Sequence, residues 1–423
     1  MFKNIFNNIS LYLRTEEIRN RIFFSILILV VFRVLASIPV VGIPADAISQ
    51  LFSGSNFGDL LSTISGGVLE TASIAAIGLT PYINASITLQ LLTPVIPKLA
   101  ELKKEGSNGR RTISMYTRLL TVPLAILQSF IIYSTLRGFG LMDVLQPLEL
   151  VAMSATLTTG SIVIMWLGEL VSESGLVSGG SSYLIFLGIL AGIPGSLTSN
   201  FQFMDPTQKV VFILLNIILI AVVVLITEAE RRVKVQYSRR VREGGAMDSY
   251  IPLKLTQSGV MPVIFAISLM SFPDLIARFL ISRDINDTVN LWSNNTIQFL
   301  ADPYVQNIGT FIFIILFSFF YVTVVFNTDE IAENLQKNGG FIQGIRPGKS
   351  TSKYLRNLSF KLTAVGAGIL AIMSILPNIL LAIGVVNQSL ITGTGLLIIV
   401  GVVLDIRRKI KSMAVVKDYG RYI

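Results

Sequence analysis

The chemistry open to this sequence is limited first by two residue types that it lacks. None of its 423 residues is cysteine or histidine, which removes thiol nucleophiles, Cys- and His-based metal sites and the most common general base. Gly348-Lys349-Ser350 resembles the end of a phosphate-binding P-loop, but the first glycine of that pattern would be residue 343, which is Gln. We therefore expect no enzyme activity and no bound metal, nucleotide or other cofactor.

The carboxylates argue against ion coupling. Glu169 and Glu228 fall at the ends of apolar stretches, and Asp46, Asp59 and Asp284 fall in the connections between them. An ion-coupled transporter is expected to hold an acidic residue near the middle of such a stretch. A secondary transporter or flippase with an inverted-repeat fold therefore remains the alternative interpretation, but the sequence does not favour it.

A pattern of glycine, proline and aliphatic residues occurs twice at one constant offset. The matching residues are Gly78, Pro81, Ile83 and Ala85 in the first copy and Gly259, Pro262, Ile264 and Ala266 in the second. In membrane helices, Gly allows close backbone approach and Pro leaves a carbonyl that neighbours must satisfy. Either these matches arose by chance, or the pattern predicts two bent or loosely packed helices in two related halves of the chain.

Composition places these stretches in a membrane. Hydrophobic residues make up 52% of the chain and charged residues only 14%, and the mean hydropathy is +0.69. A helix of about 20 apolar residues crosses a hydrocarbon core of about 30 Å. Ten candidate spans of about this length are predicted, at residues 20–38, 72–92, 114–134, 150–171, 183–199, 209–227, 257–277, 306–326, 361–383 and 389–405.

Lysine and arginine are concentrated in both terminal segments and in three connections, namely those between spans two and three, six and seven, and eight and nine. Cytoplasmic loops carry such an excess, so both termini are predicted to be cytoplasmic. The net charge of +9 then reflects membrane topology. A basic cytoplasmic face can also attract anionic lipid, an acidic protein or ribosomal RNA.

The matching signature lies in the second and seventh of the ten spans, so the chain divides as five plus five. Five is an odd number, so the second half enters the membrane from the opposite side and an inverted repeat is expected. The predicted fold is an all-α polytopic membrane protein. Its predicted segments are 1–200 with the first five spans, 201–256 with the sixth span and a cytoplasmic loop, and 257–423 with the rest of the second half.

Residues 57–70 form a short segment between the first two spans. The segment is long enough for two or three helical turns ending at Gly66-Gly67, but it is too short and too polar to cross the membrane. It is either a surface helix or a segment that folds back into the protein. From the residues alone, the surface helix is the better interpretation.

The order and spacing of many short motifs resemble the SecY family of protein-conducting channels over nearly the whole chain. The matching stretches are Arg33–Pro44, Ser65–Gly67, Gly78–Ser86, Gln90–Thr93, Leu99–Gly106, Gly109–Arg111, Trp166–Glu169, Ile251–Lys254, Gly259–Pro262, Phe326–Asn327 and Gly344–Gly348. The resemblance implies ten helices in two inverted halves around a central pore. It also implies a plug at about 57–70, with Phe57, Leu60, Leu61, Ile64, Gly66 and Gly67.

The same resemblance implies a ring of side chains that seals the pore by excluding water while yielding sideways to a passing chain. The implied members are Leu79, Ile83, Ser181, Ile185, Ile264 and Ile398. Ser181 stands where an aliphatic residue is expected, next to one additional residue. Either the ring has a hydroxyl member, or a neighbour takes its place. The implied lateral gate, between the second and seventh spans, includes Asn84, Ile87, Gln90, Pro262 and Ser268.

Two basic cytoplasmic loops are the expected docking sites for partners. The loop at 228–256 contains Arg239, Arg240 and Arg242. The loop at 327–360 begins with a helix-like segment stopped by Gly339-Gly340, and it then places Arg346 on a turn restrained by proline and glycine. A solvated loop with an ordinary cytoplasmic charge excess explains the charges but not this restrained turn.

The resemblance implies a channel that translocates unfolded secretory polypeptides and releases hydrophobic segments sideways into the bilayer. The implied location is the plasma (inner) membrane. The implied partners are small SecE-like and SecG-like membrane subunits, the SecA motor ATPase, the translating ribosome, signal-sequence-bearing polypeptides and membrane lipids.

Overall fold

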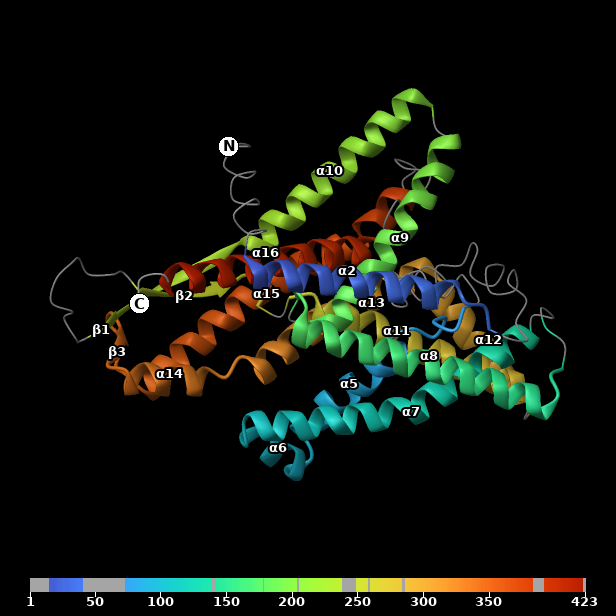
Figure 1. Cartoon of the computed structure of the whole chain (residues 1–423), viewed down its shortest axis with the longest axis horizontal. Coiled ribbons are helices and arrows are strands. Elements are labelled where there is room, and N and C mark those ends of the chain that lie inside the picture. Colours follow the sequence, from blue (N-terminus) through green and yellow to red (C-terminus); the bar gives the residue numbers. More distant parts are fainter. Residues whose placement is uncertain are drawn as a thin grey trace. The chain divides into compact units, whose positions relative to one another are not determined.

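The structure is a computed structural model. It describes residues 15–40, 73–138, 142, 144–177, 179–203, 205–237, 249–257, 259–283, 286–382 and 392–420. Helices account for most of these residues (Figure 1). They fall into two compact units, one drawn from 1–204, 267–306 and 390–423 and the other from 205–266 and 307–389.

In its described residues, the first unit is helical apart from turns and one isolated β-bridge. Its helices are α2 (Glu16–Ser37), α5 (Thr80–Leu92), α6 (Pro97–Lys104), α7 (Ser107–Gly138), α8 (Pro147–Ser174), α9 (Gly180–Phe203), α12 (Asp287–Ala301) and α16 (Gly393–Gly420). Helix α7 packs against both α5 and α8, and α9 packs against α8 and α16. Helix α12 was not expected from the sequence.

The second unit combines helices with a small sheet. Its elements are α10 (Pro206–Glu228), β1 (Glu230–Tyr237), β2 (Ser249–Lys254), most of α13 (Pro303–Val325), α14 (Thr328–Lys337), β3 (Gly340–Ile342) and α15 (Lys349–Ala382). Helix α11 (Met261–Arg283) begins in this unit and ends in the first.

Seven helices in the described part of the chain are long and apolar enough to cross a membrane, namely α2, α7, α8, α10, α11, α13 and α15. The other three predicted spans correspond to α5, α9 and α16. Helix α10 exposes many large aliphatic side chains, such as Leu225 at 71%. Such exposure indicates contact with lipid. The prediction of an all-α polytopic membrane protein is confirmed for the spanning part of the chain.

At the starts of α8 and α10, a side chain in the first helical turn accepts a hydrogen bond from the backbone N–H of the capping residue. The N–H of Gln146 donates to the Glu149 carboxylate at 3.0 Å at the start of α8, and that of Asp205 donates to Gln208 at 3.3 Å at the start of α10. A proline follows each of these two capping residues. Proline suits the first helical position because its missing N–H has no helical partner to lose.

The second span begins later than the sequence indicated. Residues 73–79 form turns, and α5 starts only at Thr80 rather than within the predicted span 72–92. Pro81 lies in the first helical turn, where it breaks no helical hydrogen bond. The expectation that this glycine and proline bend a longer helix was therefore wrong for α5, because they instead mark where the helix begins.

The two basic loops contain a three-stranded sheet that the sequence analysis did not predict. Its strand order is β2-β1-β3, and both pairs are antiparallel, with Val233 opposite Ile251 and Val235 opposite Ile342. Val233 and Val235 are buried, while the residues between and before them point outward. This alternation in Arg-Val-Lys-Val was the available signal for a strand.

Apolar side chains join this sheet to α14 and the beginning of α15. The buried members of this cluster, which we call the sheet cluster, are Val233, Val235, Leu253, Leu335, Ile342 and Leu355. Figure 1 shows the strands beside α14, in agreement with the packing of β3 against that helix. The described parts of the two loops therefore form one folded body.

Replacement of Leu355 by alanine should loosen this body. Leu355 is fully buried in the sheet cluster, and deleting such a side chain typically costs about 2–5 kcal/mol. Hydrogen exchange at the β1 amides of the full chain should therefore accelerate. Tyr354→Ala is the control, because Tyr354 is 40% exposed and its removal should leave exchange in β1 unchanged. Equal effects of the two variants would contradict this account of the cluster.

Candidate functional site

Two glycines of the repeated pattern share one unusual backbone conformation. The φ angle is +59° at Gly78 and +61° at Gly259, a region in which residues with a side chain are strained. Each glycine N–H donates to the carbonyl three residues earlier, at 2.8 Å to Ala75 and at 3.1 Å to Thr256. A helix begins two residues after each glycine. The repeated pattern is thus a repeated turn, which chance matching of sequence does not explain.

The aliphatic residues that follow these turns are buried. Leu79, Ile83 and Ile264 are each at most 5% exposed. The Ile83 N–H donates to the Leu79 carbonyl at 2.9 Å, and the Ile264 N–H donates to Val260 at 3.3 Å. Ile83 and Ile264 therefore occupy equivalent places in the first turn of α5 and α11. Each turn fixes the position from which its aliphatic residue projects.

The remaining ring candidates lie on two helices that pack together. Ile185 on α9 and Ile398 on α16 are 2% and 1% exposed, and α9 packs against α16. Ser181 lies one turn before Ile185 and is partly exposed. Ile264 belongs to the second unit and the other candidates to the first. The ring as a whole stays a prediction.

The gate candidates are distributed along α5 and α11. Asn84 and Ile87 are buried on α5, and Gln90 donates to the Ser86 hydroxyl at 2.9 Å. On α11, Pro262 and Ser268 are buried, and the Ser268 hydroxyl has no hydrogen-bond partner among the described residues. These helices thus carry polar groups among aliphatic ones, and their role as a gate also stays a prediction.

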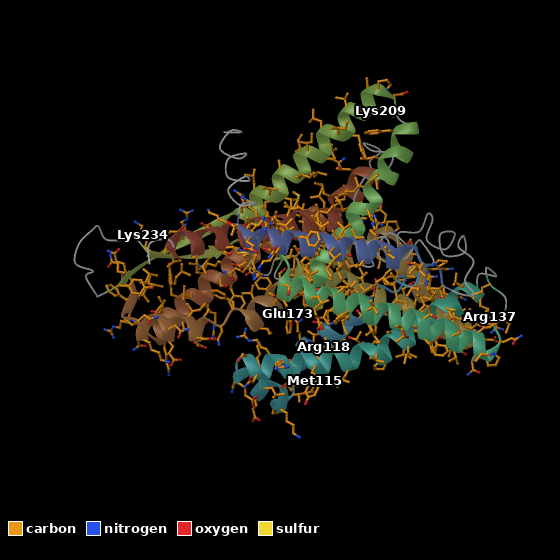
Figure 2. The ribbon with its side chains drawn as sticks, in the orientation of Figure 1. Met115, Arg118, Arg137, Glu173, Lys209 and Lys234 are labelled. Carbon is orange, nitrogen blue, oxygen red and sulfur yellow. The ribbon has the colours of Figure 1, made fainter. Side chains whose placement is uncertain are left out.

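An ion pair within the membrane helices lies close to α5. Arg118 on α7 donates through Nε to Glu169 on α8 at 2.7 Å, with the side chains 48% and 17% exposed. Tyr82 on α5 lies within electrostatic range of both groups. Figure 2 shows Arg118 toward the Met115 end of α7 and Arg137 at the other end. The sequence contained both charges but gave no sign that they pair.

A second ion pair corrects the expectation that acidic residues avoid the span interiors. Asp274 lies inside α11 and accepts a hydrogen bond from Arg278 Nε at 2.7 Å, and the two side chains are only 5% and 16% exposed. The sequence analysis did not consider Asp274. An acid and an arginine four residues apart on an apolar helix would have been the signal, because residues at that spacing face each other.

The turn that presents Arg346 is held on both sides. Gly344 and Gly348 have φ of +80° and +91°. The Thr351 hydroxyl donates to the Arg346 carbonyl at 2.9 Å, and the Arg346 side chain itself is exposed. The predicted helix before this turn is confirmed as α14, where the Asn327 side chain accepts from the Glu330 N–H at 3.3 Å.

A polar contact fixes α14 to the first turns of α15, close to this arginine. The Ser352 hydroxyl donates to the Asp329 carboxylate, which also pairs with Arg356 at 3.3 Å. On strand β1, the Arg232 guanidinium donates to the Glu230 carboxylate at 2.8 Å, and this hydrogen bond raises the pKa of Arg232. The Arg346 turn is therefore supported by the contacts between α14 and the first turns of α15.

Two sets of predicted residues lie outside the described residues. One is the plug segment, with Phe57, Leu60, Leu61, Ile64, Gly66 and Gly67, and the other is the loop tip with Arg239, Arg240 and Arg242. Among the residues that the structure describes, no group of three or more acidic side chains could hold a metal ion.

Comparison with known proteins decides the family. The SecY family model matches residues 73–407. The "Protein translocase subunit SecY" of Corynebacterium glutamicum is 39% identical, over 96% of this chain and 97% of that protein. This chain belongs to the SecY family. SecY is a channel subunit and not an enzyme, in keeping with the predicted absence of catalysis.

Solved structures agree with SecY membership at the level of the fold. The structure described as "The structure of a protein conducting channel" has a TM-score of 0.68 and 18% identity, and the match covers 93% of this chain and 92% of that one. The structure described as "Sec61 in the Canine ribosome-channel complex from the endoplasmic reticulum" has a TM-score of 0.64 and 19% identity, with the same coverage.

The Arg118–Glu169 pair should show an asymmetric response to mutation. Arg118→Ala leaves the largely buried Glu169 carboxylate without its partner and should cost about 1–3 kcal/mol. Glu169→Ala should cost less, because the half-exposed Arg118 can extend toward water. Thermal unfolding of the purified protein in detergent measures both. The double alanine variant should be more stable than Arg118→Ala alone. Equal losses that simply add would contradict a direct pair.

Proposed function

We propose that this chain forms the protein-conducting channel of a bacterial-type Sec translocase, which carries unfolded secretory polypeptides across the membrane. The observation that carries the proposal is the pair of matching turns at Gly78 and Gly259. Each turn places a buried isoleucine, Ile83 or Ile264, in the first turn of the helix that follows. The name and high identity of the Corynebacterium glutamicum protein support it.

The proposed seal is made by Leu79, Ile83, Ile185, Ile264 and Ile398, with Ser181 at its edge. Aliphatic side chains exclude water and ions by dewetting, and their rotamers adjust when a chain passes. The equivalence of Ile83 and Ile264 supports this assignment, because two related halves then contribute matching members. The plug at 57–70 would cover the outer side of the seal.

The proposed lateral gate lies between α5 and α11. Both helices begin at a turn and combine aliphatic residues with buried polar ones, such as Asn84 and Ser268. A hydrophobic signal segment could partition between them into lipid, while a polar chain would remain in the aqueous path. The gate thus sorts segments by their transfer free energy.

The proposed location is the plasma membrane, with both termini on the cytoplasmic side. The basic residues of three connections and of both terminal segments support this orientation. Figure 2 shows Lys209 near one end of α10 and Lys234 beyond its other end, on β1. In this topology, the sheet cluster and the Arg346 turn face the cytoplasm.

We propose that the Arg346 turn docks the SecA motor or the translating ribosome, together with Arg239, Arg240 and Arg242. Because the backbone is already restrained, little entropy is lost when the guanidinium meets a carboxylate or phosphate. SecE-like and SecG-like subunits, signal-bearing polypeptides and membrane lipids complete the proposed set of partners. The apolar side chains exposed on α10 leave ample surface for small helical subunits or lipid.

Asp274, the one buried acid within a span among the described residues, gives no support to a secondary transporter. Asp274 is paired with Arg278 at 2.7 Å, so its charge is already neutralised. A coupling carboxylate must instead be able to bind and release its ion.

Ion leak tests the seal. Replacing Ile83 and Ile264 together with serine should increase the conductance of the resting channel in planar bilayers, because hydroxyls stabilise water in the constriction. Leu225→Ser on the exposed face of α10 is the control and should leave conductance unchanged. The same leak in wild type and the double variant would reject the assignment of these residues to the seal.

Reversal of charge tests docking. Arg346→Glu should abolish transport, because loss of one charge-assisted contact costs about 2–5 kcal/mol, or roughly 30- to 4,000-fold in affinity for the partner. Membrane insertion and ion leak should be unchanged, because the residue lies outside the predicted spans. Partner affinity and precursor transport are measured side by side in reconstituted vesicles. The control is Arg137→Glu, because Arg137 lies in the last turn of α7, on the predicted outer face of the membrane. Normal transport by Arg346→Glu would mean that the turn does not dock the motor.

A further inference from the structure

A glycine of α8 lies directly against the turn that precedes α5. A Cβ atom built on Gly160 would lie 2.0 Å from the Ile74 carbonyl oxygen and 2.8 Å from its carbonyl carbon. Any side chain at this position would force the backbone of one segment away. The adjacent Ser161, fully buried, donates its hydroxyl to the Gly78 carbonyl at 2.8 Å. Helix α8 therefore holds this turn at two points.

A glycine of α15 makes the same contact with the turn that precedes α11. A Cβ atom on Gly366 would lie 2.2 Å from the Leu255 carbonyl oxygen and 2.9 Å from its carbonyl carbon. As at Gly160, the obstacle is backbone rather than the end of a flexible side chain. Both residues of this contact belong to the second unit.

The two contacts occupy equivalent places in the internal repeat. Ile74 and Leu255 each lie four residues before the glycine of their turn, Gly78 and Gly259. Helices α8 and α15 correspond to the fourth and ninth predicted spans, so each is the fourth span of its half. We call the two contacts the glycine sockets. The internal repeat therefore includes both the turn and the helix that packs against it.

Other close glycine contacts in the described residues differ in kind. Gly109 approaches the Leu102 carbonyl and Gly180 approaches that of Gly168, but each of these joins neighbouring segments of the chain. The sockets instead join segments that are far apart in sequence. They are therefore tertiary contacts on which the placement of α5 and α11 depends.

The second socket lacks part of the hydrogen bonding of the first. Ala367 follows Gly366, so the position equivalent to Ser161 carries no hydroxyl in the second half. The Ser359 hydroxyl donates to Gln257 instead. The hydroxyls of Thr256 and Thr363 are buried and have no hydrogen-bond partner among the described residues. The turn before α11 is accordingly held less completely than the turn before α5.

We propose that Gly160 and Gly366 are positioning residues that set how closely the ring-bearing helices approach their halves, and that α11 is the more easily displaced of the two. The inference rests on the proposed channel function, because it explains how the two isoleucines are held in place. An added methyl group at either socket pushes the turn outward and moves the attached helix with its isoleucine. The resting seal then loosens although no ring residue has changed.

Glycine-to-alanine substitutions test the sockets, and the chain supplies matched controls on the same helices. Gly366→Ala is compared with Gly368→Ala, where an added Cβ has nothing within 4 Å. Gly160→Ala is compared with Gly168→Ala, where the nearest atom is at an ordinary 3.4 Å. Reconstituted with its partner subunits, each socket variant should leak ions about tenfold more than wild type in planar bilayers, and each control should match wild type.

Hydrogen exchange supplies a readout that does not depend on transport. In the wild-type protein, amides at 255–260 should exchange faster than those at 74–79, and each socket alanine should accelerate its own turn. Ser161→Ala adds no volume, and it should bring exchange at 74–79 toward the level at 255–260. If a glycine variant does not fold, Ser161→Ala still tests whether α8 holds the turn before α5.

The outcomes separate the inference from the proposed function. If both socket variants match their controls in leak and in exchange, the sockets have no positioning role, although wild-type transport would still support the channel. If the wild-type protein transports no polypeptide but the socket variants accelerate exchange as described, the channel proposal fails and the structural role of the sockets stands. Equal wild-type exchange in the two turns would overturn the asymmetry between the halves.

Discussion

A backbone group without a hydrogen-bond partner is far more costly beside lipid than beside water, and this constraint governs both helices that carry the repeat. Each helix starts at a turn rather than continuing the preceding segment, so each turn contains carbonyls outside any helical ladder. Where water is excluded, the protein itself has to provide hydrogen-bond donors for these carbonyls. Ser161 donates to the Gly78 carbonyl. The glycines of α8 and α15 do not donate to the carbonyls of Ile74 and Leu255, but they allow close packing against them.

The charged residues follow the same constraint. Asp274 with Arg278 and Glu169 with Arg118 are each 2.7 Å apart, so two acids within or near the spans are present as neutral pairs. A buried charge is tolerated when its partner is held in good geometry. The Arg118–Glu169 pair joins α7 to α8, whereas the Asp274–Arg278 pair lies within α11, and such paired acids are poorly suited to binding and releasing an ion. They therefore fit a channel whose driving force comes from a partner.

The sequence predicted those features that depend on a continuous pattern over many neighbouring residues. Apolar stretches of membrane length located the spans, and alternation of basic loops predicted their orientation. The sequence did not reveal where α5 begins, because apolar composition extends through residues 73–79 and says nothing about φ at Gly78. The small sheet was missed because its strands are short and lie among charges, although Val233 and Val235 alternate with outward residues.

The contacts that depend on distant segments were beyond prediction from one sequence. Nothing in the spacing of Gly160 or Gly366 identifies the carbonyls that they face, and Arg118 gives no indication that Glu169 is its partner. The ring and the gate were reached through resemblance to a family. What the structure adds at Ile83 and Ile264 is the local reason that these two residues are equivalent.

The length of α15 has a mechanical consequence. Its 34 residues extend about 51 Å, against a hydrocarbon thickness of about 30 Å. The Arg346 turn is attached directly before its first residue, and Gly366 lies halfway along the same rod. Because a continuous helix resists bending, a partner that tilts the exposed end transmits the motion to the turn before α11. The part of α15 between the Arg346 turn and Gly366 contains no proline, so it couples that turn mechanically to the glycine socket before α11.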